Sequence, residues 1–407
     1  MKFEVNSGCL KTAIKALTTG CPGLDILWLN ADNKGIQIRV STREKQGVSV
    51  RINNIEHAGV GYICHEPGCV KVQVVDINGT LRQCEASQTV LINHHAAVNK
   101  VSVLSKDVEV MIPAEDGNQI WSLAGLDKPE QMFAVERDVF VNTMYSVRFA
   151  MGHDIVSPHY CGICVEASKN KLQCSAGIGS FFALKETKSK LLYTNNLINL
   201  LLPNTSISCI LALLSALSSS ILECKIYYEG TICLLNSGCL EIRIEDIPRN
   251  KFPEVSVVFQ KDFPNKLCVN MSDLRTVIKS IQAANDNARK QGDKSLCIVN
   301  TIVDTNAGNM LLKWGAVERG KVLLTPNTTF QNDKGSVIDI SSQINNLSLI
   351  CKSWRTSEEI TIFCDTNKTH IVVKPSNKEE VRENEPDAVL SSTYKKKMPT
   401  ENKGVSQ

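Results

Sequence analysis

The 407-residue sequence lacks a strong excess of charge of either sign, because 45 Lys and Arg residues stand against 42 Asp and Glu residues. The resulting net charge of +3 does not by itself predict nucleic-acid binding, so such binding would depend on how the basic residues are distributed. Long apolar runs are also absent. The most apolar window, Leu197–Leu217, is broken at Pro203, which predicts a strand and a short helix instead of a membrane span. With no signal-peptide pattern at the N-terminus, we expect a cytoplasmic protein that does not bind membranes.

Motifs for catalysis are missing as well. The sequence contains no Gly-rich phosphate loop after a strand, no nucleophile elbow and no paired His-Glu helix motif. Each of these motifs places a reactive group or a phosphate in a defined backbone geometry, so their absence removes the main support for an enzyme. We therefore expect a protein that is not an enzyme and that needs no cofactor.

Cysteine is abundant, with 16 residues, but the cysteines are scattered through apolar segments instead of forming a small disulfide-rich module. In a reducing compartment most of them should be small buried side chains. Cys161 and Cys164 have the spacing of a redox or zinc motif, but they fall in an apparent strand, where residues three apart point to opposite faces. Cys64 and Cys69, with a Pro-Gly turn between them, are the better metal candidates, although a hairpin with buried cysteines explains them equally well.

An internal repeat is the most informative feature of the sequence. Residues 2–17, 132–147 and 266–281 align without gaps, and each segment has the pattern of a short strand followed by an amphipathic helix. Apolar residues recur on one face of each predicted helix, at Leu10-Ala13-Ile14-Leu17, Phe140-Thr143-Met144-Val147 and Leu274-Val277-Ile278-Ile281. Three units of similar size are therefore expected.

A second helix is predicted in each unit, at Ile92–Leu104, Ser206–Leu217 and Ile340–Trp354. Short segments of alternating polarity, bounded by Gly-containing turns, separate the two helices of a unit and predict antiparallel strands. The expected fold class is α+β, with three repeated domains of two helices packed on antiparallel sheet. We place these domains at 1–128, 129–252 and 253–375, and expect residues 376–407 to form a disordered tail because that segment has few apolar residues.

Four segments add a family resemblance to this repeat: Phe149–Ile155, Cys161–Val165, Leu172–Leu184 and Lys251–Glu254. In order and spacing they resemble the bacterial DNA sliding clamps, the beta subunit of DNA polymerase III, over about residues 1–375. The third segment corresponds to the family's Thr-Asp-Gly-His-Arg-Leu loop, and the fourth to its Arg-Phe-Pro-Asp linker. The resemblance implies a head-to-tail homodimer that forms a ring around double-stranded DNA without regard to sequence. It also implies tethering of the DNA polymerase III catalytic subunit and the clamp loader.

The faces of the helices opposite the apolar faces, together with one loop, carry the residues expected to contact DNA. A sparse set of basic side chains suits contact with phosphates that does not depend on sequence, because a clamp must slide. The alternative is that these residues are the solvated faces of ordinary helices. The predicted DNA-binding residues are Lys11, Lys15, Lys100, Arg137, Arg148, His159, Arg275, Lys279 and Lys352.

The resemblance further implies a pocket for partner peptides between the second and third domains. Its residues would be Tyr160, Gly177, Gly179, Phe181, Phe182, Pro253, Val257, Val258, Val372, Val373 and Pro375. The chain departs from the family here: Ile178, Ser180 and Phe181 replace its Asp, His and Arg. The family's chain end, Met-Pro-Met-Arg-Leu, is assigned to the segment from Val373 with further residues after it. One alternative is that these are core residues of a clamp-like protein that recruits no partner by this route. Two others concern the whole protein: a clamp paralogue that does not serve replication, or a Cys-rich metal-binding or redox protein on a clamp scaffold.

Overall fold

The computed structural model describes most of the chain. The described residues are 1–20, 25–40, 48–53, 61–106, 108–117, 128–152, 161–168, 171–179, 181–187, 193–194, 198–215, 221–227, 232–237, 240–244, 247, 252–253, 259, 263, 265–290, 298–304, 309–314, 320–324, 330–331, 338–354, 359–364, 370–377, 382–383 and 385–392. The chain divides into two compact units. Unit 1 comprises Met1–Tyr145, Met151–Ala176 and Glu186–Phe252, and unit 2 comprises Ser146–Ala150, Gly177–Lys185 and Pro253–Gln407.

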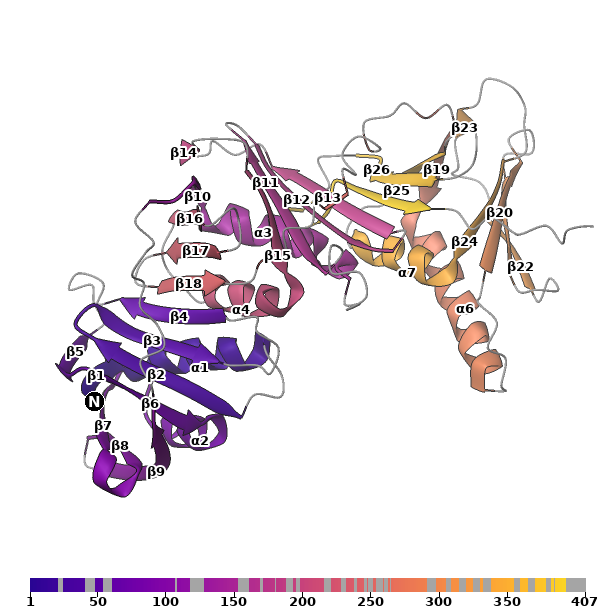
Figure 1. The fold of residues 1–407 in the computed structure, drawn as a ribbon. Coiled ribbons are helices and arrows are strands. Elements are labelled where there is room, and N and C mark those ends of the chain that lie inside the picture. The colour runs from indigo at the N-terminus through magenta and orange to yellow at the C-terminus, as the bar shows by residue number, and fades with distance from the viewer. Residues whose placement is uncertain are drawn as a thin grey trace, which may run out of the picture. The chain divides into compact units, whose positions relative to one another are not determined.

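The same order of helices and strands occurs three times along the chain (Figure 1). The first copy consists of β1 (Lys2–Asn6), α1 (Ser7–Gly20), β2 (Ile26–Asp32), β3 (Gly35–Val40), β4 (Val48–Asn53), β5 (Tyr62–Glu66), β6 (Gly68–Gln73), α2 (Val74–Arg82), β7 (Thr89–His95), β8 (Lys100–Ser105) and β9 (Val108–Asp116). The second consists of β10 (Gln131–Glu136), α3 (Arg137–Val147), β11 (Gly162–Ser168), β12 (Lys171–Ile178), β13 (Phe181–Thr187), β14 (Tyr193–Thr194), β15 (Ile198–Pro203), α4 (Asn204–Ser215), β16 (Ile221–Tyr227), β17 (Ile232–Ser237) and β18 (Leu240–Ile244). The third consists of β19 (Asn265–Asn270), α6 (Met271–Lys290), β20 (Ile298–Asp304), β21 (Asn309–Trp314), β22 (Gly320–Leu324), β23 (Phe330–Gln331), β24 (Ile338–Gln343), α7 (Ile344–Ser353), β25 (Glu359–Cys364), β26 (His370–Pro375) and β27 (Ala388–Ser392).

Strand pairing repeats together with this order. The first strand of each copy pairs antiparallel with the strand that follows the second helix, as β1·β7, β10·β16 and β19·β25. The strand after the first helix pairs with the strand before the second helix, as β2·β6, β11·β15 and β20·β24. The α+β class and the threefold repeat of two helices on antiparallel sheet are therefore confirmed.

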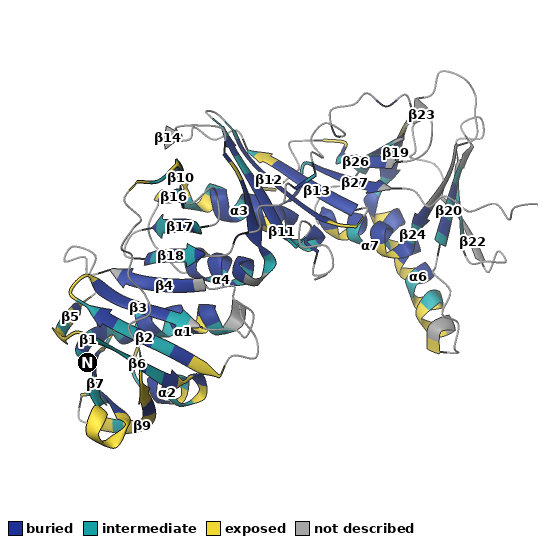
Figure 2. Ribbon diagram, viewed as in Figure 1, coloured by how far each residue is buried: buried dark blue, intermediate teal, exposed yellow. Residues whose placement is uncertain are grey.

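The apolar faces predicted for the first helices form the core of each copy. In α1, Leu10, Ala13, Ile14 and Leu17 are fully buried, and the equivalent faces of α3 and α6 are buried as well (Figure 2). The helices also pack on one another, α1 against both α2 and α4, and α6 against α7. In the described part of the chain, no helix is both long enough and apolar enough to cross a bilayer.

The second helices differ in part from the prediction. The helix expected at Ile92–Leu104 is wrong, because this stretch forms strands β7 and β8, with Val90 and Ile92 buried in alternation. The second helix of the first copy is α2, where Val74, Ile77 and Leu81 are buried at helical spacing. The expected helix at Ile340–Trp354 begins only at Ile344, because the preceding residues form β24. The helix expected at Ser206–Leu217 is present as α4.

The prediction of a disordered tail after Pro375 is wrong for residues 385–392. Strand β27 pairs on one side with β26 and on the other with β13, so it lies inside a sheet. Val389 is fully buried and Leu390 is 4% exposed. The indole nitrogen of the buried Trp354 donates to the carbonyl oxygen of Pro386 at 2.7 Å. These contacts make β27 the third strand after α7, the counterpart of β9 and β18.

Candidate nucleic-acid interface and partner groove

Three of the basic residues predicted to contact DNA reach the C-terminal end of the second helix in their own copy. Lys11 on α1 donates from Nζ to the carbonyl oxygen of Cys84, just beyond α2. Arg137 on α3 donates from Nη1 to Leu214 O in the last turn of α4 at 3.2 Å. Arg275 on α6 donates from Nε to Cys351 O of α7 at 3.2 Å, and from Nη2 to Trp354 O. A cation is favoured there because the last carbonyls of a helix have no partner within the helix and carry partial negative charge.

Replacing Arg275 by Gln should lower the free energy of unfolding of the third copy by about 1–2 kcal/mol, because the charged hydrogen bonds to the end of α7 are lost. Arg275→Lys should recover part of this loss. Lys279→Gln, an exposed change one turn along the same helix, should stay within about 0.5 kcal/mol of wild type. Urea unfolding monitored at Trp354 measures the difference. An Arg275→Gln curve that overlays wild type would contradict the capping role.

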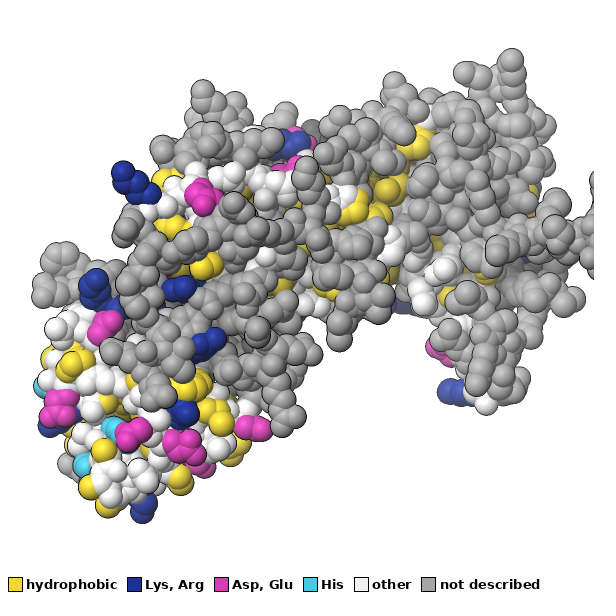
Figure 3. All heavy atoms as spheres, viewed as in Figure 1, with side chains coloured by type: hydrophobic (Ala, Val, Ile, Leu, Met, Phe, Trp, Pro, Cys, Tyr) yellow, Lys and Arg dark blue, Asp and Glu magenta, His cyan; other side chains and the backbone are white. Residues whose placement is uncertain are grey.

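The remaining predicted DNA contacts lie in several kinds of structure. Lys15, Lys279 and Lys352 are exposed on α1, α6 and α7. Lys100 was predicted on a helix, which is wrong, because it begins strand β8. Arg148 lies in the 3-10 helix η2 (Arg148–Ala150), and His159 lies outside the described residues. The basic and acidic side chains of described residues are intermixed over the first copy in Figure 3.

Two equivalent strand pairings connect the copies, and we call them seams. The first seam is β4 with β18, where Val50 pairs with Ile242. The second seam is β13 with β27, where Ala183 pairs with Val389. In each seam, one strand is the third strand after the first helix of its copy. The other is the third strand after the second helix of the next copy. Because side chains of directly paired residues lie on the same face of a sheet, these registers define which residues share a face at each seam.

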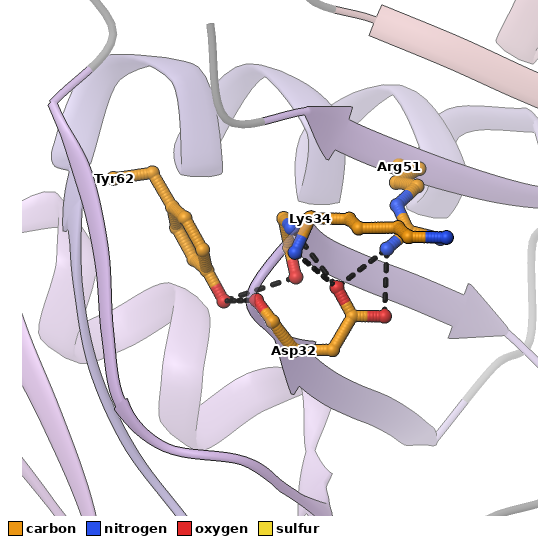
Figure 4. A network of polar contacts seen from close by, with 5 residues as sticks. Asp32, Lys34, Arg51 and Tyr62 are labelled. Atoms are coloured by element: carbon orange, nitrogen blue, oxygen red, sulfur yellow. Dashed lines mark hydrogen bonds and ion pairs between the residues drawn. The ribbon is translucent and has the colours of Figure 1, made fainter. Parts of the chain in front are cut away.

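The face of the first seam opposite the buried valines and isoleucines is charged. Arg51 pairs across the strands with Glu241, and its guanidinium contacts both carboxylate oxygens of Asp32 at 2.5 and 2.7 Å (Figure 4). The hydroxyl of Tyr62 donates to the carbonyl oxygens of Asp32 and Gly35 at 2.8 and 2.9 Å. Burial raises the pKa of Glu241, and nearby Arg51 and Arg243 partly offset that rise. This face of the seam therefore carries charged side chains, of which Arg51 is buried and Asp32 is partly exposed.

The equivalent face of the second seam is apolar. Phe182, Leu390 and Val372 form one row across β13, β27 and β26, and none is more than 7% exposed. The Phe182 ring lies directly on Gly177, where an added Cβ would be 2.2 Å from Cδ1 of Phe182. Gly179 has a φ of 58° at the turn before β13, a conformation that favours glycine. The two seams therefore share a backbone pairing but differ in chemistry.

The opposite face of the second seam packs toward helices. Phe181, Ser391 and Ile371 form the neighbouring row. Phe181 contacts Phe149 edge-on, with ring centroids 6.1 Å apart, and the side-chain amide of Asn346 on α7 donates to the Ser391 hydroxyl at 3.0 Å. Val373 shares this face through its pairing with Val389. Phe181 and Val373 are thus core residues of unit 2 and do not lie on the face that carries Phe182.

The predicted partner pocket is therefore brought together only in part. Gly177, Phe182 and Val372 gather at the second seam, Pro253 and Pro375 are described elsewhere in unit 2, and Tyr160, Val257 and Val258 lie outside the described residues. The assignment of the last strand to Val372–Pro375 is wrong, because β27 follows it and holds the seam. Ala388 and Leu390, which pair with Leu184 and Phe182, were therefore not among the predicted residues. The repeat could have predicted β27, because β9 and β18 are the third strands after the second helices of the first and second copies.

The two cysteines of the better metal candidate lie on strands with different partners. Cys64 lies on β5, which pairs with β1, whereas Cys69 lies on β6, which pairs with β2 and β9, so the Pro-Gly turn does not close a hairpin between them. Cys164 is buried in β11, and its burial raises the pKa of the thiol to about 12. Among the described residues, no group of three or more His, Cys, Asp or Glu side chains is placed to hold a metal ion.

Three copies of two helices on antiparallel sheet, joined through equivalent seams, define the fold of the bacterial DNA sliding clamps. Solved structures with this fold include the DNA polymerase III beta subunit of Thermotoga maritima, with a TM-score of 0.75 and 16% sequence identity over 97% of this chain and 99% of that chain. The beta subunit of Pseudomonas aeruginosa matches with a TM-score of 0.73 and 13% identity over 97% and 100% of the two chains. The sliding clamp of Bacillus subtilis matches with 0.73 and 15% over 97% and 99%. No protein-family profile and no curated protein sequence matches the chain.

Proposed function

We propose that the protein is a DNA sliding clamp, a non-catalytic ring of two chains that encircles duplex DNA and tethers a replicative polymerase. The observation that carries this proposal is how the edge strands of the three copies are paired with one another. Of the three equivalent strands β4, β13 and β22, the first two are paired in seams with β18 and β27. β22 in the third copy is equivalent to β4 and β13, and β9 in the first copy is equivalent to β18 and β27. These two strands are the members left over at the two ends of the repeat. A second chain that pairs its β22 with β9, and its β9 with β22, closes a ring.

The edge of β9 supports this closure. β9 pairs with β8 over Val108–Pro113 and with β6 over Ala114–Asp116, so within the described residues Val108–Pro113 has a partner strand on one side only. Val108 and Met111 on this stretch are 60% and 43% exposed. Beside them lies a hollow of about 340 Å³, lined by Thr80, Gln83, Cys84, Glu85, Gln88, Val103, Ser105, Lys106, Val108 and Val110. In the third copy, β22 is an edge strand of its four-stranded sheet. A free edge with apolar side chains is a ready surface for strand pairing.

We further propose that partner peptides dock against the apolar face of the second seam, where Phe182 and Leu390 are 7% and 4% exposed. Replacing Phe182 by Ala should weaken binding of the host polymerase or clamp-loader peptides by about 1–3 kcal/mol, the usual loss at an anchor residue. Phe182→Leu, which keeps more of the packing on Gly177, serves as the folding control. Isothermal titration gives the affinity, and thermal unfolding checks the fold. Unchanged affinity in a folded Phe182→Ala protein, or unfolding of both variants, would remove Phe182 from the groove.

Primer extension by the host replicative polymerase and clamp loader tests the function itself. Adding the protein should lengthen the products made in a single binding event, because a tethered polymerase rebinds its template before it diffuses away. Products of equal length with and without the protein would contradict a processivity role.

A further inference from the structure

The gap-free repeat places three exposed side chains at one equivalent position, in the first helix of each copy. Lys15 of α1, Tyr145 of α3 and Lys279 of α6 are each the fourteenth residue of the aligned segments 2–17, 132–147 and 266–281. Each of them is exposed, and Tyr145 is 39% exposed although the residues on either side of it are buried. A large aromatic side chain held outside the core at the position of two lysines points to a common binding role.

The position one turn earlier has a different role in the first and third copies. Lys11 and Arg275 are equivalent in the repeat, and both donate to carbonyl oxygens at the end of the second helix. The second copy has Val141 there, which is 7% exposed, and Arg137 supplies the same contact from one turn further back. The capping contact is thus present in all three copies, although in the second copy it comes from a different position of the repeat. Cations committed to helix ends are less able to follow a phosphate backbone.

We infer that Lys15, Tyr145 and Lys279 form the DNA-contacting position of the three first helices, whereas Lys11, Arg137 and Arg275 are positioning residues. Tyr145 is the new member of this set. Its hydroxyl donates a hydrogen bond to a phosphate oxygen, whereas the two lysines contribute ionic contacts, and none of the three recognises a base. The inference rests on the proposed function, since it names the residues that meet DNA inside the ring.

The two chemistries can be separated by salt. Each lysine that neutralises a phosphate adds about 0.9 to the slope of log affinity against log salt, whereas a neutral hydroxyl adds nothing to it. Lys15→Gln and Lys279→Gln should therefore lower the slope for a short duplex, measured by fluorescence anisotropy on the dimeric protein. Lys34→Gln, an exposed lysine on the β2–β3 turn, removes the same charge elsewhere and should leave the slope unchanged. Equal slopes for Lys15→Gln, Lys279→Gln and Lys34→Gln would overturn the assignment of the lysines.

Tyr145→Phe removes only the hydroxyl, and it should weaken duplex affinity by about threefold to tenfold at every salt concentration without changing the slope. Tyr145→Ala should lose at least as much, and unfolding midpoints of both variants should match wild type because the side chain is not in the core. Wild-type affinity in Tyr145→Phe and Tyr145→Ala would overturn the role of Tyr145. Failure of the unaltered protein to bind duplex at all would count against the clamp function instead, so the two failures are distinguishable.

Discussion

Ending the chain after Asn377 should unfold the third copy, although the residues removed are mostly polar. The truncation deletes β27, exposing the edges of β13 and β26, and it takes away the buried Val389 and Leu390. It also removes the acceptor of the Trp354 indole and the Asp387 carboxylate that contacts the 8% exposed Lys185 at 3.0 Å. Two lost apolar side chains at about 1.5–3 kcal/mol each and an orphaned donor at about 1–3 kcal/mol amount to about 4–9 kcal/mol. That loss is comparable with the whole stability of a domain.

The matched control ends after Ser392 and keeps β27 while removing only residues 393–407. It should unfold at the wild-type denaturant midpoint, whereas the chain ending after Asn377 should show weak near-ultraviolet dichroism and rapid exchange of the β25 and β26 amides. A native midpoint in the shorter chain would mean that β27 contributes little and that the second seam is not part of the fold.

Placing a charge on the free edge of β9 should separate the proposed dimer into single chains. Met111 is 43% exposed in the isolated chain, so Met111→Asp should fold normally. In the proposed dimer the carboxylate would be desolvated against the partner's third copy without a counter-charge. We expect the dissociation constant of the dimer to rise by at least about a hundredfold, equivalent to about 3 kcal/mol.

Sedimentation across a concentration series measures this shift, with Met111→Leu as the control that keeps an apolar side chain at the edge. Met111→Leu should sediment as the wild-type dimer. If Met111→Asp also remained dimeric at every concentration, β9 would not be the interface, and the proposed pairing of β9 with β22 would be wrong. A wild-type chain that stays monomeric would contradict the homodimer directly.

The first helices could be predicted because their apolar spacing is strong and repeated. Leu10, Ile14 and Leu17 specify the buried face of α1 without help from any other part of the chain. Helix α2 could not be predicted in this way, because Asp76, Asn78 and Gly79 are poor helix formers and its helical state depends on packing. The alternating residues of β7 and β8 were mistaken for the missing helix. Local pattern was sufficient only where it agreed with tertiary packing.

Strand β27 was missed for a related reason. The charged connection between β26 and β27 is longer than an ordinary hairpin loop, and its composition resembles that of a disordered segment. Only the comparison of the three copies predicts a strand after it. The prediction of the partner pocket was affected in the same way, because β26 was taken as the last strand in place of β27. The sequence pointed to Phe182, whereas its pairing with Leu390 is known only from the strand register.

The capping role of the basic residues lies beyond local sequence for a different reason. Lys11, Arg137 and Arg275 meet carbonyl groups more than seventy residues away, and the sequence alone presents them as cations on polar helix faces. The same face also carries the exposed Lys15 and Lys279. Separating the two sets requires the position of the second helix, which the sequence analysis had misplaced in the first copy.

The most direct test of the central claim measures how long the assembled protein stays on linear duplex DNA whose two ends are blocked by bulky bound proteins. A ring that encircles DNA should remain on this substrate as long as on a closed circle, and cutting off one block should release it promptly by sliding. Release from the uncut substrate at the rate seen with free ends would show that the protein holds DNA by surface contact. That result would contradict a clamp.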